Sequence, residues 1–85
     1  MPFSVYFTDT SEKELGRLDK TFQKRIKARL EKVSSGPMLF VKRLKGVELF
    51  SLRVGNYRVI LNIEWTGQKI TVMRIGPRKN VYDKL

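Results

Sequence analysis

The dipeptide Gly55-Asn56 stands between two runs of β-favouring residues, VELFSLRV and YRVILNIEW. A two-residue connection of this composition is typical of a tight β-hairpin, because glycine and asparagine tolerate the positive φ angles that such a turn requires. The turn sets the register of the hairpin and places Arg53 opposite Arg58. A slip of one residue would exchange the two faces of the sheet, so this dipeptide constrains the fold more than any other feature.

This register assigns the side chains of the hairpin to two chemically different faces. One face is apolar and is expected to form the core: Phe50, Leu52, Val54, Tyr57, Val59 and Leu61. The other face carries Leu49, Ser51, Arg53, Arg58, Ile60 and Asn62. Arg53 and Arg58 therefore meet as a cross-strand pair, although like charges directly opposite each other are unfavourable.

A third β-favouring run, KITVMRI, follows the hairpin. A three-residue loop at 66–68 would add Arg74 to the face of the arginine pair and send Met73 and Ile75 into the core. A two-residue loop would bury the charge of Arg74 instead, which is costly. We therefore expect the three-residue loop.

The first half of the chain predicts a strand and two helices. Apolar and polar residues alternate over positions 3–8, which is typical of a strand. Ser11 and Glu14 have the spacing of a capping box and predict the start of a helix. A second helix is predicted from the apolar residues Phe22, Ile26, Leu30 and Val33, and Gly36 and Pro37 end it. The helices should form a hairpin that turns near Asp19.

The order β, α, α, β, β, β predicts an α+β fold. We expect the N-terminal strand, the helical hairpin and a three-stranded antiparallel meander to form one domain over residues 1–85. The helices should pack on one face of a four-stranded antiparallel sheet. The segment VKRLKG, before the meander, is compatible with a loop or with a short extended piece.

The charge of the chain predicts an anionic partner. Its 18 Lys and Arg against 8 Asp and Glu give a formal net charge of +10, and such self-repulsion needs compensation. Nucleic acid is the first candidate, and an anionic membrane or an acidic protein are the others. Arginines with tyrosine nearby are typical of an RNA site. The basic residues of the second helix are interpreted as a solvated surface: Lys24, Arg25, Lys27 and Lys32.

Several residue types are absent. The sequence has no Cys, which favours a reducing cytoplasm, and neither a membrane-spanning run nor a leader peptide is apparent. It also has no His, the commonest general base and metal ligand. The carboxylates are scattered, so we expect no metal and no cofactor.

The motifs LFSLRVGNYRVILNIEW, RKNVY and KRLKG resemble those of the RelE/ParE superfamily of toxins, and most of all archaeal and bacterial RelE-type toxins. The predicted element order fits this resemblance along the whole chain. The resemblance implies a ribosome-dependent endoribonuclease that cuts mRNA in the decoding site without a metal. It implies Arg58, Arg78 and Tyr82 as catalytic residues, with Gly76-Pro77 turning the tail toward the arginine pair.

The resemblance also implies a surface for substrate RNA, with Arg53, Lys42, Lys45, Arg74 and Lys79 as its residues. One departure concerns the general base, because Leu49 and Ser51 stand where bacterial members carry lysines. Lys42 or Lys45 could reach the site instead. The general base could equally be supplied by no residue of the protein.

The resemblance leaves two alternative functions open. The chain could be a ParE-like toxin that poisons DNA gyrase, or a catalytically silent domain that binds RNA or the ribosome. As an endoribonuclease, it would have mRNA and the ribosome as partners. For each of the three functions, a cognate, acidic, RelB-like antitoxin is expected to wrap the helices or to cover the basic face.

Overall fold

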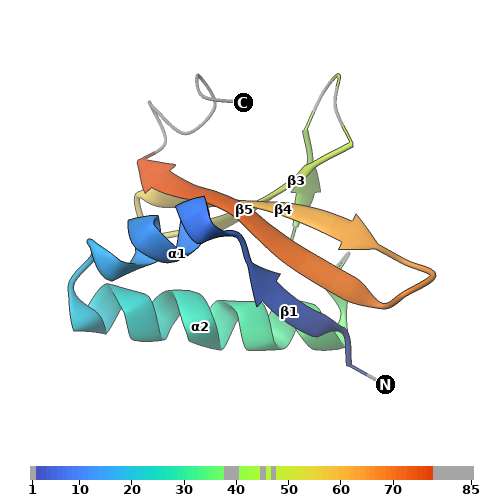
Figure 1. Cartoon of the computed structure of the whole chain (residues 1–85), viewed down its shortest axis with the longest axis horizontal. Coiled ribbons are helices and arrows are strands. Elements are labelled where there is room, and N and C mark those ends of the chain that lie inside the picture. The colour runs from blue at the N-terminus through green and yellow to red at the C-terminus, as the bar shows by residue number, and fades with distance from the viewer. Residues whose placement is uncertain (1, 38–40, 45, 47, 78–85) are drawn as a thin grey trace.

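The structure is a computed structural model that describes residues 2–37, 41–44, 46 and 48–77. These residues form two helices and five strands: β1 (Ser4–Phe7), α1 (Asp9–Gly16), α2 (Lys20–Ser35), β2 (Lys42–Arg43), β3 (Phe50–Val54), β4 (Tyr57–Glu64) and β5 (Lys69–Pro77). Figure 1 shows α2 crossing below the sheet and α1 lying beside β5. The predicted α+β fold is confirmed.

The strands form one sheet in the order β1-β5-β4-β3-β2, which differs from the expected four-stranded antiparallel sheet in two ways. First, β2 adds a fifth strand within the segment VKRLKG, where a short extended piece was one of the two expectations. Second, β1 pairs with β5 in parallel. No tight turn joins these two strands, so nothing local in the sequence determines their relative direction.

The predicted register of the β3–β4 hairpin is correct. Val54 pairs with Tyr57 and Arg53 pairs with Arg58. The expected core face of the hairpin is buried, with Tyr57 partly buried at its end. The turn dipeptide therefore sets the register as its composition predicts.

The predicted loop between β4 and β5 is one residue too short. Glu64 pairs with Lys69, and a β-bulge shifts the register between Ile60 and Leu61. The bulge compensates for the longer loop, so that Arg74 pairs with Ile60 and joins the face of the arginine pair as expected. Met73 was expected in the core, but it is only partly buried and lies outside the core cluster.

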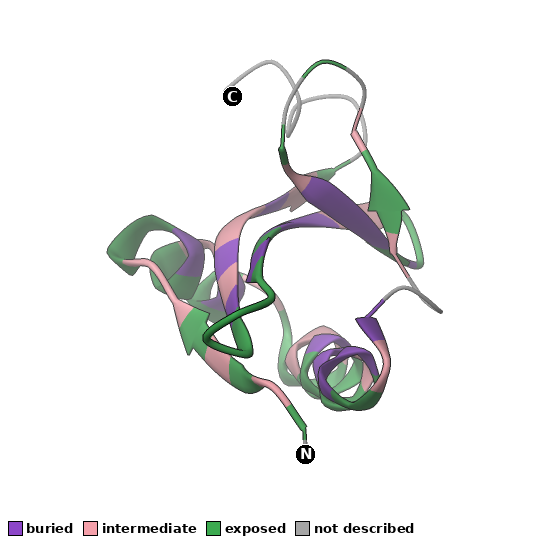
Figure 2. Cartoon of the chain, turned by 90° about the vertical axis from the view of Figure 1, so that its right-hand side faces the viewer, coloured by how far each residue is buried: buried purple, intermediate pink, exposed green. Residues whose placement is uncertain are grey.

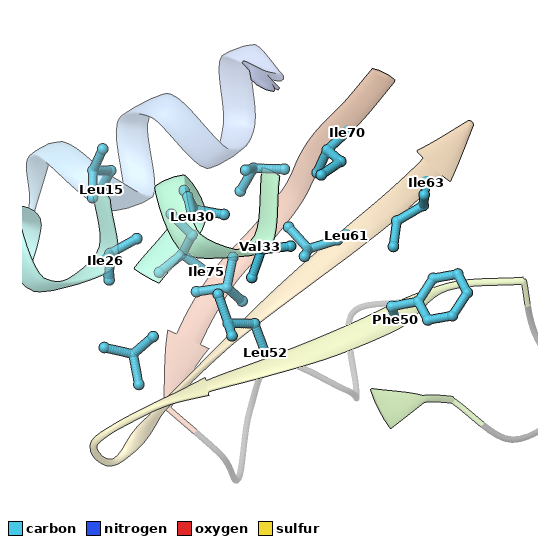
Figure 3. Close-up of a cluster of buried hydrophobic side chains, with 13 residues drawn as sticks. Leu15, Ile26, Leu30, Val33, Phe50, Leu52, Leu61, Ile63, Ile70 and Ile75 are labelled. Carbon is cyan, nitrogen blue, oxygen red and sulfur yellow. The ribbon is translucent and has the colours of Figure 1, made fainter. Parts of the chain in front are cut away.

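The main core lies between α2 and the sheet (Figure 3). Ile26, Leu30 and Val33 of α2 are at most 3% exposed, and Leu15 of α1 joins them. Figure 2 shows the buried stripe of α2 facing the sheet. Burial of such aliphatic side chains stabilises a fold by roughly 1.5–3 kcal/mol each. The helical hairpin thus covers one face and leaves the other for the basic residues.

The first helix begins earlier than the predicted capping box. Thr8 is its N-cap, and the Thr8 side-chain oxygen accepts a hydrogen bond from the Ser11 backbone N–H at 3.1 Å. The Ser11 hydroxyl instead donates to the Val72 carbonyl at 2.7 Å. The prediction that Ser11 starts the helix is therefore wrong, because the side chains of Ser11 and Glu14 bond to β5.

The second helix begins and ends where the sequence indicates. The Asp19 carboxylate accepts from the Phe22 backbone N–H at 2.8 Å, and Gly36 follows the last helical residue. Neither α1 nor α2, nor any other helix among the residues described, is long and apolar enough to cross a membrane.

Candidate nucleic-acid interface

The face of the sheet turned away from the main core carries the predicted arginine pair. Arg53 pairs with Arg58, and Arg58 pairs on its other side with Gly76. The Arg53 side chain is exposed, whereas Arg58 is partly buried. Glycine adds no side chain to this row, so the two guanidinium groups dominate its chemistry. Such groups match the geometry of phosphate oxygens.

A second row of cross-strand paired residues lies on the same face, next to the arginine row and further from the β3–β4 turn. Its members pair in sequence across four strands: Lys42, Ser51, Ile60 and Arg74. Ile60 is fully buried and Ser51 is 8% exposed, so the floor of this row is excluded from solvent. Lys42 is exposed at the edge of the sheet. The row thus has a dry centre with a basic residue at each end.

Lys42 pairs with Ser51, which stands where the resemblance leads us to expect a lysine. Paired residues of neighbouring strands point to the same face, and their strands are about 4.8 Å apart. Lys42 therefore lies beside Ser51, one of the two positions where the resemblance leads us to expect a lysine. Sequence reasoning could name Lys42 as a candidate but could not place it, because the sequence does not distinguish a loop from a strand at VKRLKG.

Arg74 differs from the other basic residues of this face in being held by a carboxylate. Its Nη2 atom lies 2.9 Å from Glu14 Oε2, and its Nε atom donates to the same carboxylate at 3.2 Å. The side chains are 20% and 18% exposed, respectively. Arg74 shares a face with the arginine pair, but its guanidinium is directed to α1. Sequence reasoning missed Glu14, because its partner is far away in the chain.

Four predicted site residues lie outside the described part of the chain: Lys45, Arg78, Lys79 and Tyr82. The last described residue is Pro77, which pairs with Tyr57 at the end of the sheet that carries the arginine pair. Arg78 follows Pro77 directly in the sequence. The roles assigned to these four residues stay predictions.

The charges of the strands around the arginine pair are mostly positive. Glu64 is the one acidic residue in the described strands β3, β4 and β5 and the β4–β5 loop. It pairs with Lys69 at the end of β4 far from the arginine pair. Within the described ranges, the one ion pair shorter than 4.0 Å is that of Glu14 with Arg74. The same ranges contain no group of three metal-ligating side chains. The arrangement can therefore attract and neutralise an anion through guanidinium groups.

Solved structures with the same fold define the class of this protein. The RelBE2 toxin–antitoxin complex of Mycobacterium tuberculosis contains a chain that is 25% identical, with a TM-score of 0.84 over 92% of this chain and 100% of that one. The archaeal RelE–RelB complex of Pyrococcus horikoshii contains one that is 26% identical, with a TM-score of 0.81 over 95% and 100%. A mutant of E. coli RelE in the free state shares the fold at 20% identity, with a TM-score of 0.84 over 98% and 93%.

Residues 5–82 match the family model of the ParE toxin of type II toxin–antitoxin systems, parDE. No significant match was found among the sequences of curated proteins. The chain belongs to the ParE toxin family and is a type II toxin of the RelE/ParE superfamily. The expected superfamily is thereby confirmed.

Proposed function

We propose that this toxin is a ribosome-dependent endoribonuclease of RelE type, which cuts mRNA in the decoding site and stops translation in the cytoplasm. The observation that carries the proposal is the cross-strand pair of Arg53 and Arg58 on the face opposite the main core. Two guanidinium groups held opposite each other present donors that match the oxygens of a phosphate bound between them. The fold shared with RelE structures supports the same function.

In the proposed reaction, the 2′-hydroxyl of one ribose attacks the adjacent phosphorus and the 5′-oxygen of the next nucleotide leaves. The hydroxyl loses its proton to a base, the leaving oxygen gains one, and a 2′,3′-cyclic phosphate results. Arg58 stabilises the charge that develops on the phosphate. Arg78 does so too or assists the leaving group, and Tyr82 orients or stacks on a nucleotide.

The proposed substrate surface continues across the basic face. Arg53 holds the phosphate backbone beside Arg58, and Lys42 contacts the RNA from its position beside Ser51. We assign Lys45 and Lys79 to the same surface. We assign Arg74 to this surface because it shares the face, although its guanidinium is bonded to Glu14.

The test is primer extension on a defined mRNA in a purified translation system. Wild type is compared with an Arg58→Ala, Arg78→Ala double variant that has the wild-type melting temperature. We expect cuts within codons at the decoding site that appear only with ribosomes and disappear in the variant. Intact message in the presence of translating ribosomes would contradict the proposal.

A second function is favoured by one finding, the match to the ParE toxin model. A ParE-like toxin would poison DNA gyrase and leave RNA intact. Inhibition of gyrase-catalysed supercoiling by the purified toxin, with no cleavage of mRNA, would establish this function. Arrest of translation with intact message and unaffected supercoiling would instead identify a silent ribosome-binding domain.

We propose a cognate antitoxin of RelB type as the protein partner. Similar chains were solved in complexes with RelB antitoxins, and the net charge of +10 favours an acidic partner. A groove of about 260 Å³ between β1 and α2 is lined by Val5, Phe7, Lys27, Leu30, Glu31 and Ser34. The antitoxin should cover this groove or the basic face. Hydrogen exchange of the complex would separate the two, because only the covered surface gains protection.

A further inference from the structure

Two arginines from different elements converge on the turn between β3 and β4. A Cβ atom built on Gly55 would lie 3.7 Å from both Nη1 and Nη2 of Arg25, which belongs to α2. On the other side of the turn, Arg53 Nε lies 3.5 Å from the Gly55 carbonyl oxygen. Arg58 faces Arg53 across the hairpin. The turn thus brings the helix layer and the basic face of the sheet together.

The side chain of Arg25 is oriented by aromatic neighbours. Its guanidinium lies 5.0 Å from the centre of the Phe22 ring, and that ring lies 4.6 Å from the ring of Tyr57. A guanidinium stacked on a ring can still donate from the N–H groups at the edge of its plane. Arg25 is an exposed residue. The group is therefore arranged in advance to bind an anion.

The sequence predicts no special role for Arg25, because basic residues on the outer face of a helix are usually solvated. The structure separates it from the other basic residues of α2 by its contact with the turn. No carboxylate lies within 4.0 Å of its guanidinium among the residues described. Arg25 therefore adds a third guanidinium, from α2, to the two that β3 and β4 place next to the same turn.

We infer that Arg25 binds a backbone phosphate of RNA, and that the RNA-binding surface extends from Arg53 and Arg58 around the β3–β4 turn onto α2. This inference rests on the proposed function and adds a contact outside the site of cleavage. Arg25 contributes to RNA binding and not to catalysis. It belongs to the helix layer, whereas the proposed reacting phosphate lies on the sheet face beside Arg58. Stacked arginine suits this role, since phosphate needs a donor fork and not only a charge.

The test measures binding of a fluorescently labelled single-stranded RNA of about 20 nucleotides, long enough for the site sizes usual in such proteins. Anisotropy is recorded over a range of salt concentrations. Arg25→Gln is compared with Lys32→Gln, which removes the same charge from the last turn of the same helix. Loss of one phosphate contact should lower the slope of log affinity against log salt by about 0.7. We expect binding to be weaker by about tenfold or more for Arg25→Gln, as for loss of one charge-assisted hydrogen bond, and little change for Lys32→Gln.

Arg25→Lys keeps the charge, so it should restore most of the slope of log affinity against log salt. A purely structural role of Arg25 would not predict this recovery. Equal effects of Arg25→Gln and Lys32→Gln would overturn the inference, because net charge alone would explain them. Absence of RNA binding by wild type at low salt would overturn it as well. Primer extension with ribosomes tests cleavage independently, so failure of this inference and failure of the proposed function give different results.

Discussion

Glu14 and Arg74 form a bidentate ion pair that joins α1 to β5 across 60 positions of the chain. The same carboxylate accepts a hydrogen bond from the Ile75 backbone N–H at 2.8 Å. Together with the bonds of Thr8 and Ser11 to the carbonyls of β5, it holds α1 along the edge of β5 beyond the end of β1 (Figure 1). These contacts position the strand that leads to Arg78.

Replacement of Glu14 by Ala should lower the free energy of unfolding by about 2–3 kcal/mol, because a partly buried guanidinium and a backbone N–H lose their acceptor together. Urea unfolding at neutral pH, followed by circular dichroism, measures the change. Glu12→Ala is the matched control, since Glu12 is exposed on the same helix and should cost no more than about 0.5 kcal/mol. Equal losses in the two variants would show that the contacts of Glu14 contribute nothing.

Replacement of Arg53 by Gln should stabilise the folded toxin by about 0.5 kcal/mol, because it removes the repulsion between Arg53 and Arg58. The gain should be larger at low salt than in about 1 M NaCl, where charges are screened within about 3 Å. Lys24→Gln makes the same change in net charge on an exposed face of α2. A gain of the same size in Lys24→Gln would attribute the effect to net charge instead. Under the proposed function, Arg53→Gln should also cleave less mRNA.

Replacement of Gly55 by Ala should destabilise the toxin by about 1–2 kcal/mol, because Gly55 has a φ of +59°. The new Cβ would also lie 3.0 Å from Phe22 Cζ, so the ring would have to shift. Gly16→Ala in α1 is the control, because no atom lies within 4 Å of its added Cβ. That change should be neutral or stabilising by up to about 1 kcal/mol. Thermal unfolding of both variants measures the change. A wild-type melting temperature for Gly55→Ala would show that the turn tolerates a side chain without strain.

Replacement of Lys42 by Met should reduce ribosome-dependent cleavage about 100-fold if Lys42 transfers a proton in the reaction. The neighbouring change Arg43→Met is the control, since Arg43 pairs with Phe50 and points to the opposite face. It removes the same charge and should change the rate by no more than about threefold. Recovery of the rate in Lys42→Arg would show that Lys42 acts through its charge. Identical rates in Lys42→Met and wild type would exclude Lys42 from the reaction.

Features that depend on near neighbours in the chain could be predicted from the sequence. Gly55-Asn56 set the pairing of Arg53 with Arg58, and alternation then separated the core face from the basic face. Asp19 and Gly36 marked the ends of α2. These features follow from turn geometry, side-chain periodicity and capping, all of which act over a few residues.

Relationships between distant residues became visible only in the folded chain. Glu14 has the spacing of a capping residue, yet its carboxylate accepts hydrogen bonds from the Arg74 side chain and the Ile75 backbone N–H. Lys42 lies beside Ser51 because of a two-residue strand, and Arg25 reaches the β3–β4 turn because α2 packs on the sheet. The physical reason is the same in each case. A polar group bonds to whichever partner the packed layers bring within reach, and the local sequence does not indicate that partner.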